Sequence, residues 1–344
     1  LDAVCGVLWQ GLSWLANVDL VLTVPAPLQV AGFSLVVLMA LLVPFNGFRK
    51  AAACVTSLWI AMIVFRGEGM EGTNETVAHP EIWVWDVGQG LSVLLRERDR
   101  VLLYDTGPAL EGVYSSVESV LIPNLNALGV RRIDTLVISH GDGDHAGGLP
   151  LLFDRFKVGR IVTGEPGRVA DKLPVGVKVE PCSGQVDVKM GDLELELWQS
   201  RGRVEGNDAS CVLTVSSVVP PVEVVLPGDI TRRVEEEFMA RADHYRNDTD
   251  RYRVVLAPHH GSKTSSSEPW VAWMAPNLAV VSAGYRHRFG HPHADVVERY
   301  QSVGSDIANT ATSGAIRLVL EPGGVITTKA RAATPFWIRK PETP

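Results

Sequence analysis

Apolar side chains are distributed differently in the N-terminal part of the chain and in the rest. Residues 20–48 contain no charged side chain, and the apolar run 28–45 would span roughly 27 Å as a helix, close to the thickness of a bilayer. A second apolar run, 51–65, follows Arg49 and Lys50. Helices that are apolar on every face need a very large core or a membrane, so we expect a transmembrane hairpin rather than a buried hairpin of a soluble protein.

The whole of residues 1–66 is therefore predicted to be an all-α membrane segment. Its start repeats apolar side chains at helical spacing and contains Trp9 and Trp14, which is typical of an amphipathic helix at the membrane interface or against other membrane helices. Arg49 and Lys50 lie in the hairpin turn, and short cytoplasmic loops favour such charges. We thus expect everything after residue 66 in the periplasm or extracellular space. With no initiator Met and no cleavable signal, the chain is expected to begin inside a longer protein.

After a polar linker at residues 67–80, the pattern changes to short apolar runs separated by turn residues. Runs of this length and composition predict strands, and helical stretches lie between some of them. We expect a globular domain at 81–330 and a Pro-rich tail at 331–344. The predicted strands are 82–85, 92–95, 101–104, 136–138, 175–179, 193–197, 211–215, 222–226, 253–257, 278–281, 316–320 and 325–328, and the predicted helices are 117–128, a helix from 149, and 231–241.

Charge and cysteine content limit the classes of partner. The total net charge is −7, and residues 1–66 carry two acidic and three basic side chains, so the remainder holds −8. An acidic domain argues against nonspecific adhesion to nucleic acid, but bound dications can reverse the local field for a phosphodiester. The four cysteines show no Cys-x-x-Cys spacing, which excludes a zinc ribbon. Cys182 and Cys211 either pair outside the cytoplasm or remain two buried thiols.

Candidate chemistry is concentrated where the predicted strand 136–138 ends. There His140, Asp142, Asp144 and His145 fall within six residues, separated by glycines that let the backbone curl around a small cation. Imidazole and carboxylate groups together suit zinc or manganese. Asp and Gly are also ordinary turn residues, and Asp can cap a helix. Two histidines that flank two aspartates are harder to explain in that way, so we predict a metal site.

Two later strands also end in candidate ligands. Asp229 follows the strand 222–226 directly before a predicted helix, where it is either a metal ligand or an N-cap. His259 and His260 follow the strand 253–257. Because adjacent residues of a strand point in opposite directions, we expect only one of these histidines to bind metal.

These motifs resemble the metallo-β-lactamase fold. The His-x-Asp-x-Asp-His form, followed by Gly-Gly, is similar to the C-terminal nuclease-like domain of ComEC-type proteins, the membrane channels of bacterial DNA uptake, and 86–90 and 105–107 resemble the opening motifs of that domain. The resemblance covers about residues 82–328 and is weakest at 153–204. It implies an α/β domain, an αββα sandwich with two facing sheets and helices outside.

The resemblance also implies two divalent ions, manganese or zinc. One would be held by His140, Asp142 and Asp229, and the other by Asp144, His145, His260 and the shared Asp229. Asp142 in place of the usual His shifts the preference toward manganese. Paired dications activate water for attack on a phosphoryl group. Asp105 and Asp86 are expected to support the metal ligands, although turn chemistry explains Asp86 nearly as well.

Further residues are expected to act on the substrate. Asp144, His259 and His291 are the expected catalytic residues; His291, in a Gly-His-Pro motif, would protonate the leaving oxygen or contact phosphate, unless it belongs to an ordinary surface loop. Most relatives have a third metal His that is absent here, since no His lies between His145 and His244. The expected substrate-binding residues are Asn207, Ser210, Ser262, Thr264, Ser265 and Arg286.

Three functions compete at this point. The first is a metal-dependent nuclease that acts on DNA, in particular the single strand discarded during uptake, in concert with other competence proteins at the cell membrane. The second is a hydrolase of the same fold for a phosphocholine ester or thioester. The third is a noncatalytic domain that guides DNA. The expected membrane hairpin favours the first function over the second.

Overall fold

The computed structural model describes residues 73–182, 186–202, 205–241 and 250–333. The chain divides into two compact units, Leu1–Gly72 and Thr73–Pro344. The predicted membrane segment 1–66, the first part of the linker and the tail from residue 334 lie outside the described residues. Within the described ranges, no helix has the length and apolarity needed to cross a bilayer.

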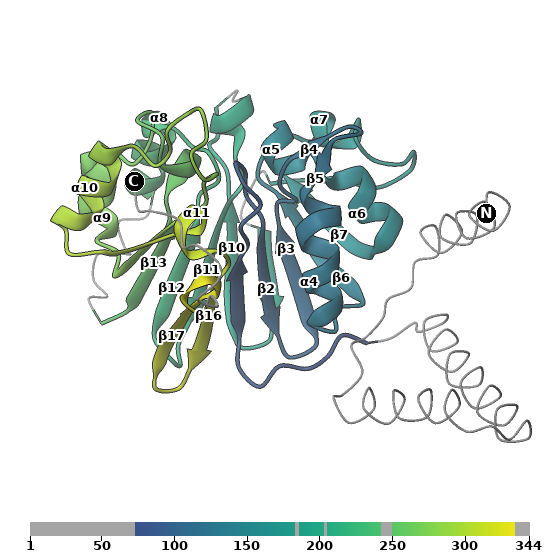
Figure 1. The fold of residues 1–344 in the computed structure, drawn as a ribbon, viewed down its shortest axis with the longest axis horizontal. Helices are drawn as coiled ribbons and strands as arrows, with labels where there is room; N and C mark the ends of the chain where they lie inside the picture. The colour runs from purple at the N-terminus through teal and green to yellow at the C-terminus, as the bar shows by residue number, and fades with distance from the viewer. Residues whose placement is uncertain (1–72, 183–185, 203–204, 242–249, 334–344) are drawn as a thin grey trace, which may run out of the picture. The chain divides into compact units, whose positions relative to one another are not determined.

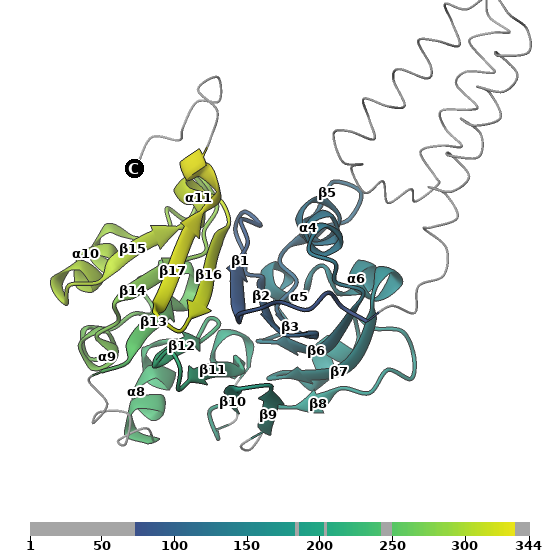
Figure 2. The ribbon, with the colours of Figure 1, turned by 90° about the horizontal axis from the view of Figure 1, so that it is seen from below.

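Two mixed sheets face each other in the described part of the second unit (Figure 1, Figure 2). The first sheet has the order β17 (Gly324–Lys329), β16 (Ile316–Glu321), β1 (Glu81–Val84), β2 (Val93–Glu97), β3 (Arg100–Tyr104), β6 (Arg132–Ile138), β7 (Lys157–Thr163) and β8 (Glu180–Pro181). The second sheet has the order β15 (Asp306–Asn309), β14 (Leu278–Val281), β13 (Tyr252–Leu256), β12 (Val222–Leu226), β11 (Val212–Ser217), β10 (Leu193–Trp198) and β9 (Val186–Met190).

Buried side chains form three layers of core, one between the sheets and one on each outer face. Successive side chains of a strand point to opposite faces. In β2, Leu95 therefore packs between the sheets and Leu94 packs against helices, and in β12 Val224 and Val225 divide in the same way. The predicted αββα sandwich is thus confirmed. The helices outside the first sheet include η1 (Val117–Leu121), α4 (Ile122–Ala127) and α6 (Leu149–Arg155), and those outside the second include α8 (Arg232–Arg241), α9 (Glu268–Met274) and α10 (Ala294–Ser302).

Parallel strands in each sheet bring their carboxyl ends to one edge of the sandwich. β3, β6 and β7 are parallel in the first sheet, and β12, β13, β14 and β15 are parallel in the second. The segments that follow these strands contain Asp105, the 140–145 turn, Asp229, the His259–His260 pair and the 282–293 segment. Ligands in parallel-stranded domains bind at such an edge, and this edge lies at the top of Figure 1.

Some predicted elements differ from the structure. The strand expected at 175–179 is wrong: Val175 is fully exposed, and only the short β8 follows it. Strand β7 was not predicted, because its outer half alternates exposed and half-buried positions around Gly159. Strand β15 was not predicted either, since the sequence Asp-Ile-Ala-Asn is too short and polar to stand out.

Residues on both sides of the predicted domain 81–330 contact it. Asn74, expected in the linker, is buried and accepts hydrogen bonds from the amides of Arg131 (2.8 Å) and Arg132 (3.0 Å). At the other end, Arg331 forms an ion pair with Asp86 at 2.7 Å. The domain therefore includes residues 73–80 of the predicted linker and the start of the predicted tail.

A disulfide bond joins Cys182 to Cys211, with the Cα atoms 5.8 Å apart. Of the two possibilities left open by the sequence, pairing is the one found in the structure. Cys182 follows β8 of the first sheet and Cys211 precedes β11 of the second, so the bond ties the two sheets together. The Cys211 amide also donates to the carbonyl of Ser139 (2.9 Å), directly before the 140–145 turn. The disulfide thus lies close behind the candidate ligands.

Candidate metal centre

The turn after β6 carries the first candidate ligands. It leads into a short helix, α5 (Gly143–Ala146), in which the amides of His145 and Ala146 donate to the carbonyl of Asp142. This tight turn brings His140 and His145 to one side, and both are fully buried. A side chain at Gly147 would overlap neighbouring backbone atoms. The Gly-Gly after the motif therefore lets the turn pack closely against the rest of the edge.

Two groups of side chains each offer three metal-binding atoms. The first contains His140, His145 and Asp229, and the second contains Asp144, His145 and His260; the ligand atoms of each group lie within 4.8 Å of one another. Asp229 Oδ1 is 3.2 Å from His145 Nε2, and Asp229 Oδ2 is 3.5 Å from His260 Nε2. The Asp229 carboxylate therefore lies between both histidines, as a shared ligand must.

The hydrogen-bond partners of the three histidines leave one nitrogen of each ring available to a cation. Each Nδ1 atom has a hydrogen-bond partner: Ser139 Oγ at 3.0 Å for His140, Asp105 Oδ2 at 2.8 Å for His145, and the Ser282 carbonyl at 2.9 Å for His260. Each Nε2 atom is buried without a hydrogen-bond partner. A carbonyl only accepts, so His260 must donate through Nδ1, which leaves the Nε2 lone pair directed at the carboxylates. Buried polar atoms are rarely left unpaired, and metal-binding histidines are typically held in this way.

Asp105 is a fully buried carboxylate that holds the turn in place. Its oxygens accept from the Ser139 amide (2.7 Å), the Ser139 hydroxyl (2.8 Å) and His145 Nδ1 (2.8 Å). Its backbone φ is +60°, a region that non-glycine residues seldom adopt. Strain of this kind persists where surrounding contacts enforce it. The predicted supporting position of Asp105 is consistent with this geometry.

Electrostatic coupling across the centre shifts the pKa values of its members. Burial alone raises the pKa of Asp229, but His145 and His260 outweigh burial and hold that pKa well below its usual range. Burial alone lowers the pKa of His145, but Asp229 and Asp105 raise it well above the usual value. The centre therefore keeps Asp229 ionised and attracts positive charge to the space between these groups.

The sequence model of the metallo-beta-lactamase superfamily matches residues 85–285. The chain belongs to this superfamily. It is 33% identical over 333 residues to Competence protein ComA of Neisseria gonorrhoeae, covering 96% of this chain and 44% of that protein. It is 29% identical over 260 residues to ComE operon protein 3 of Bacillus subtilis (strain 168), covering 69% of this chain and 32% of that protein. The chain thus spans less than half the length of these curated relatives.

Solved structures of the metallo-beta-lactamase superfamily are also similar to the chain. The metallo-beta-lactamase fold protein YhfI from Bacillus subtilis is 13% identical, with a TM-score of 0.46, and the likeness covers 69% of this chain and 99% of that one. Members of the metallo-beta-lactamase superfamily are generally metal-dependent hydrolases and typically bind divalent ions, often zinc.

The two adjacent histidines differ in position. His260 is buried and belongs to the second metal-binding group, whereas the His259 side chain is 23% exposed, with Nε2 3.8 Å from Asp229 Oδ2. The expected roles, with His260 as the ligand and His259 toward the substrate, stay predictions. The reason given from the sequence was wrong, because both residues lie in a tight turn with positive φ rather than at the end of a strand.

Asp142, an expected ligand of the first ion, contacts both Arg168 and His140. It lies outside the two metal-binding groups, and its carboxylate forms an ion pair with Arg168 at 2.8 Å. The other oxygen is 3.4 Å from His140 Nε2. Arg168 is in turn held by Glu165 at 2.9 Å, and Glu165 accepts the Gly141 amide at 2.7 Å. Arg168 and Glu165 lie in the stretch where the family resemblance is weakest, and no local pattern marks them.

The residues expected to bind substrate fall into two sets. Asn207 Nδ2 is 3.3 Å from His259 Nε2, and Thr264 Oγ1 is 2.9 Å from His259 Nδ1, so both lie beside this partly exposed histidine, at what we call the opening of the centre. Ser262 is next to Thr264, with 3.1 Å between their hydroxyls.

Ser210 and Ser265 were expected to bind substrate, and this expectation is wrong because both side chains are fully buried. Ser265 donates to the Ile230 carbonyl (2.7 Å), and Ser210 donates to the Asn207 carbonyl and accepts the Asp229 amide (3.0 Å). Their hydroxyls therefore hold the backbone of the centre and do not reach a substrate.

His291 lies beside the opening of the centre. Its ring centroid is 6.0 Å from that of His259 and 6.4 Å from that of His260. Burial, with His260 and His259 nearby, lowers the pKa of His291 to about 4. Gln89, which sequence reasoning missed, lies 3.3 Å from His291 Nδ1 and accepts the Gly284 amide. Gln89 falls in the 86–90 motif, and that resemblance was the signal that could have found it.

Two other expected residues lie away from the two metal-binding groups. The carboxylate of Asp86 contacts the Gly88 amide and forms an ion pair with Arg331, so it holds the loop that carries Gln89. Arg286 is exposed, with its guanidinium 5.3 Å from the centre of the Tyr285 ring. The expected roles of Asp86 and Arg286 stay predictions.

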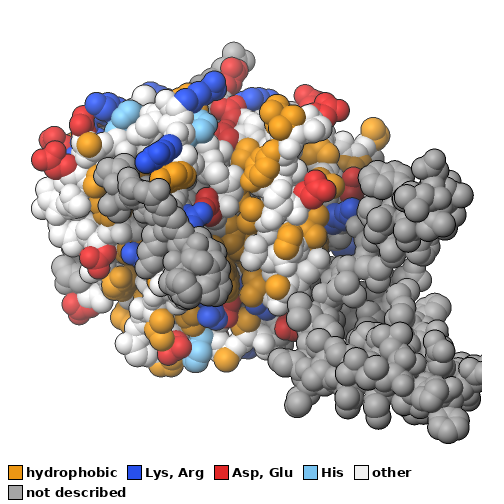
Figure 3. All heavy atoms as spheres, in the orientation of Figure 1, with side chains coloured by type: hydrophobic (Ala, Val, Ile, Leu, Met, Phe, Trp, Pro, Cys, Tyr) orange, Lys and Arg blue, Asp and Glu red, His pale blue; other side chains and the backbone are white. Residues whose placement is uncertain are grey.

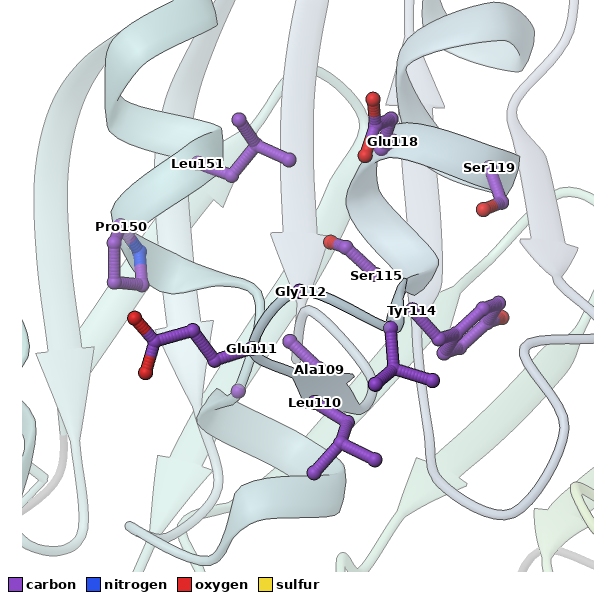
Figure 4. A pocket seen from close by; sticks show the side chains of 12 residues that line it. Ala109, Leu110, Glu111, Gly112, Tyr114, Ser115, Glu118, Ser119, Pro150 and Leu151 are labelled. Atoms are coloured by element: carbon purple, nitrogen blue, oxygen red, sulfur yellow. The ribbon is translucent and has the colours of Figure 1, made fainter.

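A hollow of about 730 Å³ lies on the other flank of the 140–145 turn. It is bounded by the hairpin of β4 (Ala109–Leu110) and β5 (Tyr114–Ser115) and by the start of α6 (Figure 4). Glu111 and Leu151 are among its lining residues. It contains none of the candidate metal ligands and is therefore distinct from the metal centre.

Proposed function

We propose that the domain is a metal-dependent phosphodiesterase that hydrolyses DNA as part of a bacterial DNA-uptake protein. The observation that carries this proposal is that the buried Nε2 atoms of three histidines lie near carboxylates: His140 and His145 are grouped with Asp229, and His145 and His260 with Asp144. The competence protein and operon protein to which the chain is similar support DNA as the substrate.

In this proposal both groups of candidate ligands hold cations, and other residues hold the substrate. His140 would hold one divalent ion and Asp144 with His260 the other, Asp229 would be shared, and His145, whose free Nε2 can bind only one ion, would complete one of the two sites. Manganese and zinc are both suited to such ligands. When bound, paired divalent ions polarise phosphoryl oxygens and supply hydroxide near neutral pH. His259, with Asn207 and Thr264 beside it, is placed to orient a phosphate at the opening.

His291 supplies a proton-handling group at the same opening. Its pKa of about 4 keeps the imidazole neutral at pH 7. A neutral imidazole accepts a proton or a hydrogen bond, so His291 would stabilise a hydroxyl group of the substrate; protonation of the leaving oxygen would require a rise in that pKa when phosphate is bound. We retain Asp144, His259 and His291 as the proposed catalytic residues.

The location of the domain is part of the same proposal. A disulfide between Cys182 and Cys211 is typical of an oxidising compartment, whereas cytosolic thiols stay reduced. The apolar residues 20–65 are suited to a membrane hairpin, and the charges at its turn favour a cytoplasmic turn. Together these features support a membrane protein whose hydrolase domain faces the periplasm or extracellular space.

One observation favours a second function, noncatalytic guidance of DNA. Asp142, an expected ligand of the first ion, forms an ion pair with Arg168, so part of its negative charge is already balanced without a metal. Under that function the domain would bind DNA and cleave nothing.

The test is hydrolysis by the purified full chain in detergent, supplied with manganese or zinc. Substrates would be a labelled single-stranded oligonucleotide, bis(p-nitrophenyl) phosphate, a phosphocholine ester and a thioester. We expect metal-dependent hydrolysis of both phosphodiesters that EDTA removes. Intact DNA in a metal-loaded chain would contradict the nuclease proposal, and selective hydrolysis of the phosphocholine ester or the thioester would replace it by another reaction of the same fold.

A further inference from the structure

A basic, aromatic segment leads away from the metal centre. Residues 282–293 connect β14 to α10 and contain two arginines and three histidines but no carboxylate, in a chain whose net charge is −7. The segment begins at Ser282, whose carbonyl holds His260 at 2.9 Å, and it passes through His291. Positive charge is therefore concentrated at the rim of the centre.

Two aromatic rings of this segment are open to solvent. Tyr285 is 45% exposed and Phe289 is 49% exposed, and Tyr114 is the other exposed aromatic side chain among the described residues. Large rings are normally buried for their hydrophobic free energy. Two exposed rings within five residues, next to a candidate active site, are surfaces on which a flat ligand can pack.

Each exposed ring is accompanied by a guanidinium group. The Arg286 guanidinium lies 5.3 Å from the Tyr285 ring centroid, and the Arg288 guanidinium lies 4.9 Å from that of Phe289. Cation and ring therefore form a unit that offers both a stacking face and a positive charge. Proteins that bind single-stranded nucleic acid combine these two features, because bases stack on rings while phosphates meet basic side chains.

The rings continue inward to the metal centre. Phe289 lies 5.7 Å from His291, and His291 is stacked over His260 at 6.4 Å with an interplanar angle of 21°. A hollow of about 190 Å³, lined by Tyr285, Arg286 and His291 among others, lies along this path. Figure 3 shows basic and histidine side chains at the upper left of the domain, the side on which α10 lies in Figure 1. The rings of Phe289, His291 and His260 thus lead from the exposed surface to the buried candidate ligand.

We propose that residues 284–291 are a binding platform for single-stranded DNA. Bases stack on Phe289 and Tyr285, and Arg286 and Arg288 contact the flanking phosphates as the strand enters the metal centre. Unpaired bases expose their faces and paired bases within a duplex do not, so the platform selects single strands. The inference rests on the proposed function for the identity of the reaction, and it adds the residues that bind the strand.

The test compares Phe289→Leu and Tyr285→Leu in the full chain. Leucine keeps an apolar side chain and removes the ring. Ile326→Ala is the matched control, because Ile326 is 48% exposed on β17, outside the segment. Binding of a labelled single-stranded oligonucleotide would be measured by anisotropy in EDTA, where no metal-dependent cleavage occurs.

We expect each leucine variant to weaken oligonucleotide binding by about 5- to 100-fold. Phe289→Trp, which keeps an aromatic ring, should bind like the wild type, and an oligonucleotide without bases should be insensitive to the leucine changes. In cleavage assays with metal, the loss on the oligonucleotide should exceed the loss on bis(p-nitrophenyl) phosphate. Equal binding by the leucine variants and by Ile326→Ala would overturn the platform.

Two other outcomes would also overturn it. The leucine variants could weaken binding of a blunt duplex as much as binding of a single strand, or lose binding to anionic lipid vesicles while keeping oligonucleotide binding, which would assign the rings to a membrane surface. Failure of the proposed function is distinguishable, because a chain that hydrolyses no phosphodiester in any metal can still show ring-dependent oligonucleotide binding in EDTA.

Discussion

The turn after β6 and the segment after β14 both leave strand ends at the same edge, yet they are built in opposite ways. In the first, His140 and His145 are fully buried, and their Nδ1 atoms have fixed partners. In the second, Tyr285 and Phe289 are exposed, and each ring has an arginine guanidinium packed over it. The comparison indicates that the chemistry depends on a rigid interior and recognition on an accessible rim.

The largest effect is expected from Asp229→Asn, which breaks the interior side of the comparison. The amide cannot act as the anionic ligand between His145 and His260, and it keeps nearly the same shape. We expect hydrolysis of bis(p-nitrophenyl) phosphate to fall by more than the roughly 10- to 100-fold typical of residues that only orient ligands. Asp192→Asn is the matched control, because Asp192 is an exposed acid paired with Arg98. Similar rates for the two variants would remove Asp229 from the centre.

Metal affinity is expected to rise with pH. Burial alone lowers the pKa of His145 and His260, but Asp229 faces both and their pKa values are raised in the metal-free protein. Protons therefore compete with the metal, and affinity should change by about 10- to 100-fold per pH unit, for one or two protons released. Titration calorimetry in buffers of different ionisation enthalpy measures this release, and an affinity independent of pH from 6 to 8 is inconsistent with histidine ligands.

The same groups predict the opposite trend for stability without metal. A raised pKa stabilises the folded state fully below the unfolded value of about 6.5 and loses this contribution as pH rises through the folded value. Metal-free protein in EDTA should thus unfold at lower denaturant as pH increases above about 6.5, while added metal stabilises it more.

Asp105→Asn should reduce metal affinity by about 10- to 100-fold without abolishing binding. The amide cannot serve as the same charged acceptor for His145 Nδ1 and for the Ser139 hydroxyl. Competition with a fluorescent chelator measures the affinity. A complete loss of metal binding would place Asp105 among the ligands. An affinity equal to that of the wild type would show that the 140–145 turn keeps its ligands in position without the Asp105 carboxylate.

The disulfide between the two sheets is expected to stabilise the folded domain, and its removal tests this. Replacing Cys182 and Cys211 together by Ala removes a link with a sequence separation of 29 and should cost about 2–4 kcal/mol in the free energy of unfolding. Denaturant unfolding of the full chain, with the wild type under reducing conditions as a comparison, measures the loss. Equal midpoints for oxidised and reduced wild type would show that the bond contributes nothing to stability.

The smallest expected effect is that of Arg168→Gln, which sharpens the position of Asp142. Arg168 is half exposed, and surface ion pairs contribute at most about 1 kcal/mol. Release of Asp142 toward His140 should raise metal affinity by up to about fivefold. A fall in affinity would instead show that Arg168 supports the centre. Glu118→Gln is the control, because Glu118 is an exposed charged residue of η1 outside the two groups of candidate ligands.

Much of the interior was predictable and much of its surroundings was not. Imidazole and carboxylate groups at the ends of apolar runs pointed to His140, His145, Asp229 and His260, because the ends of parallel strands meet at one edge. Local sequence does not fix the direction of a hydroxyl, so Ser210 and Ser265 were wrongly expected at the substrate. Arg168 reaches Asp142 from a separate helix, α7 (Pro166–Ala170), and no spacing rule predicts such a contact.

The most direct measurement of the central claim is the number of metal ions bound per full chain. Elemental analysis after dialysis against manganese or zinc should give about two ions per wild-type chain and a marked loss for Asp229→Asn, with Asp192→Asn unchanged. A wild-type chain that binds no divalent ion at saturating metal and pH 8 would contradict the claim that these side chains form a metal centre.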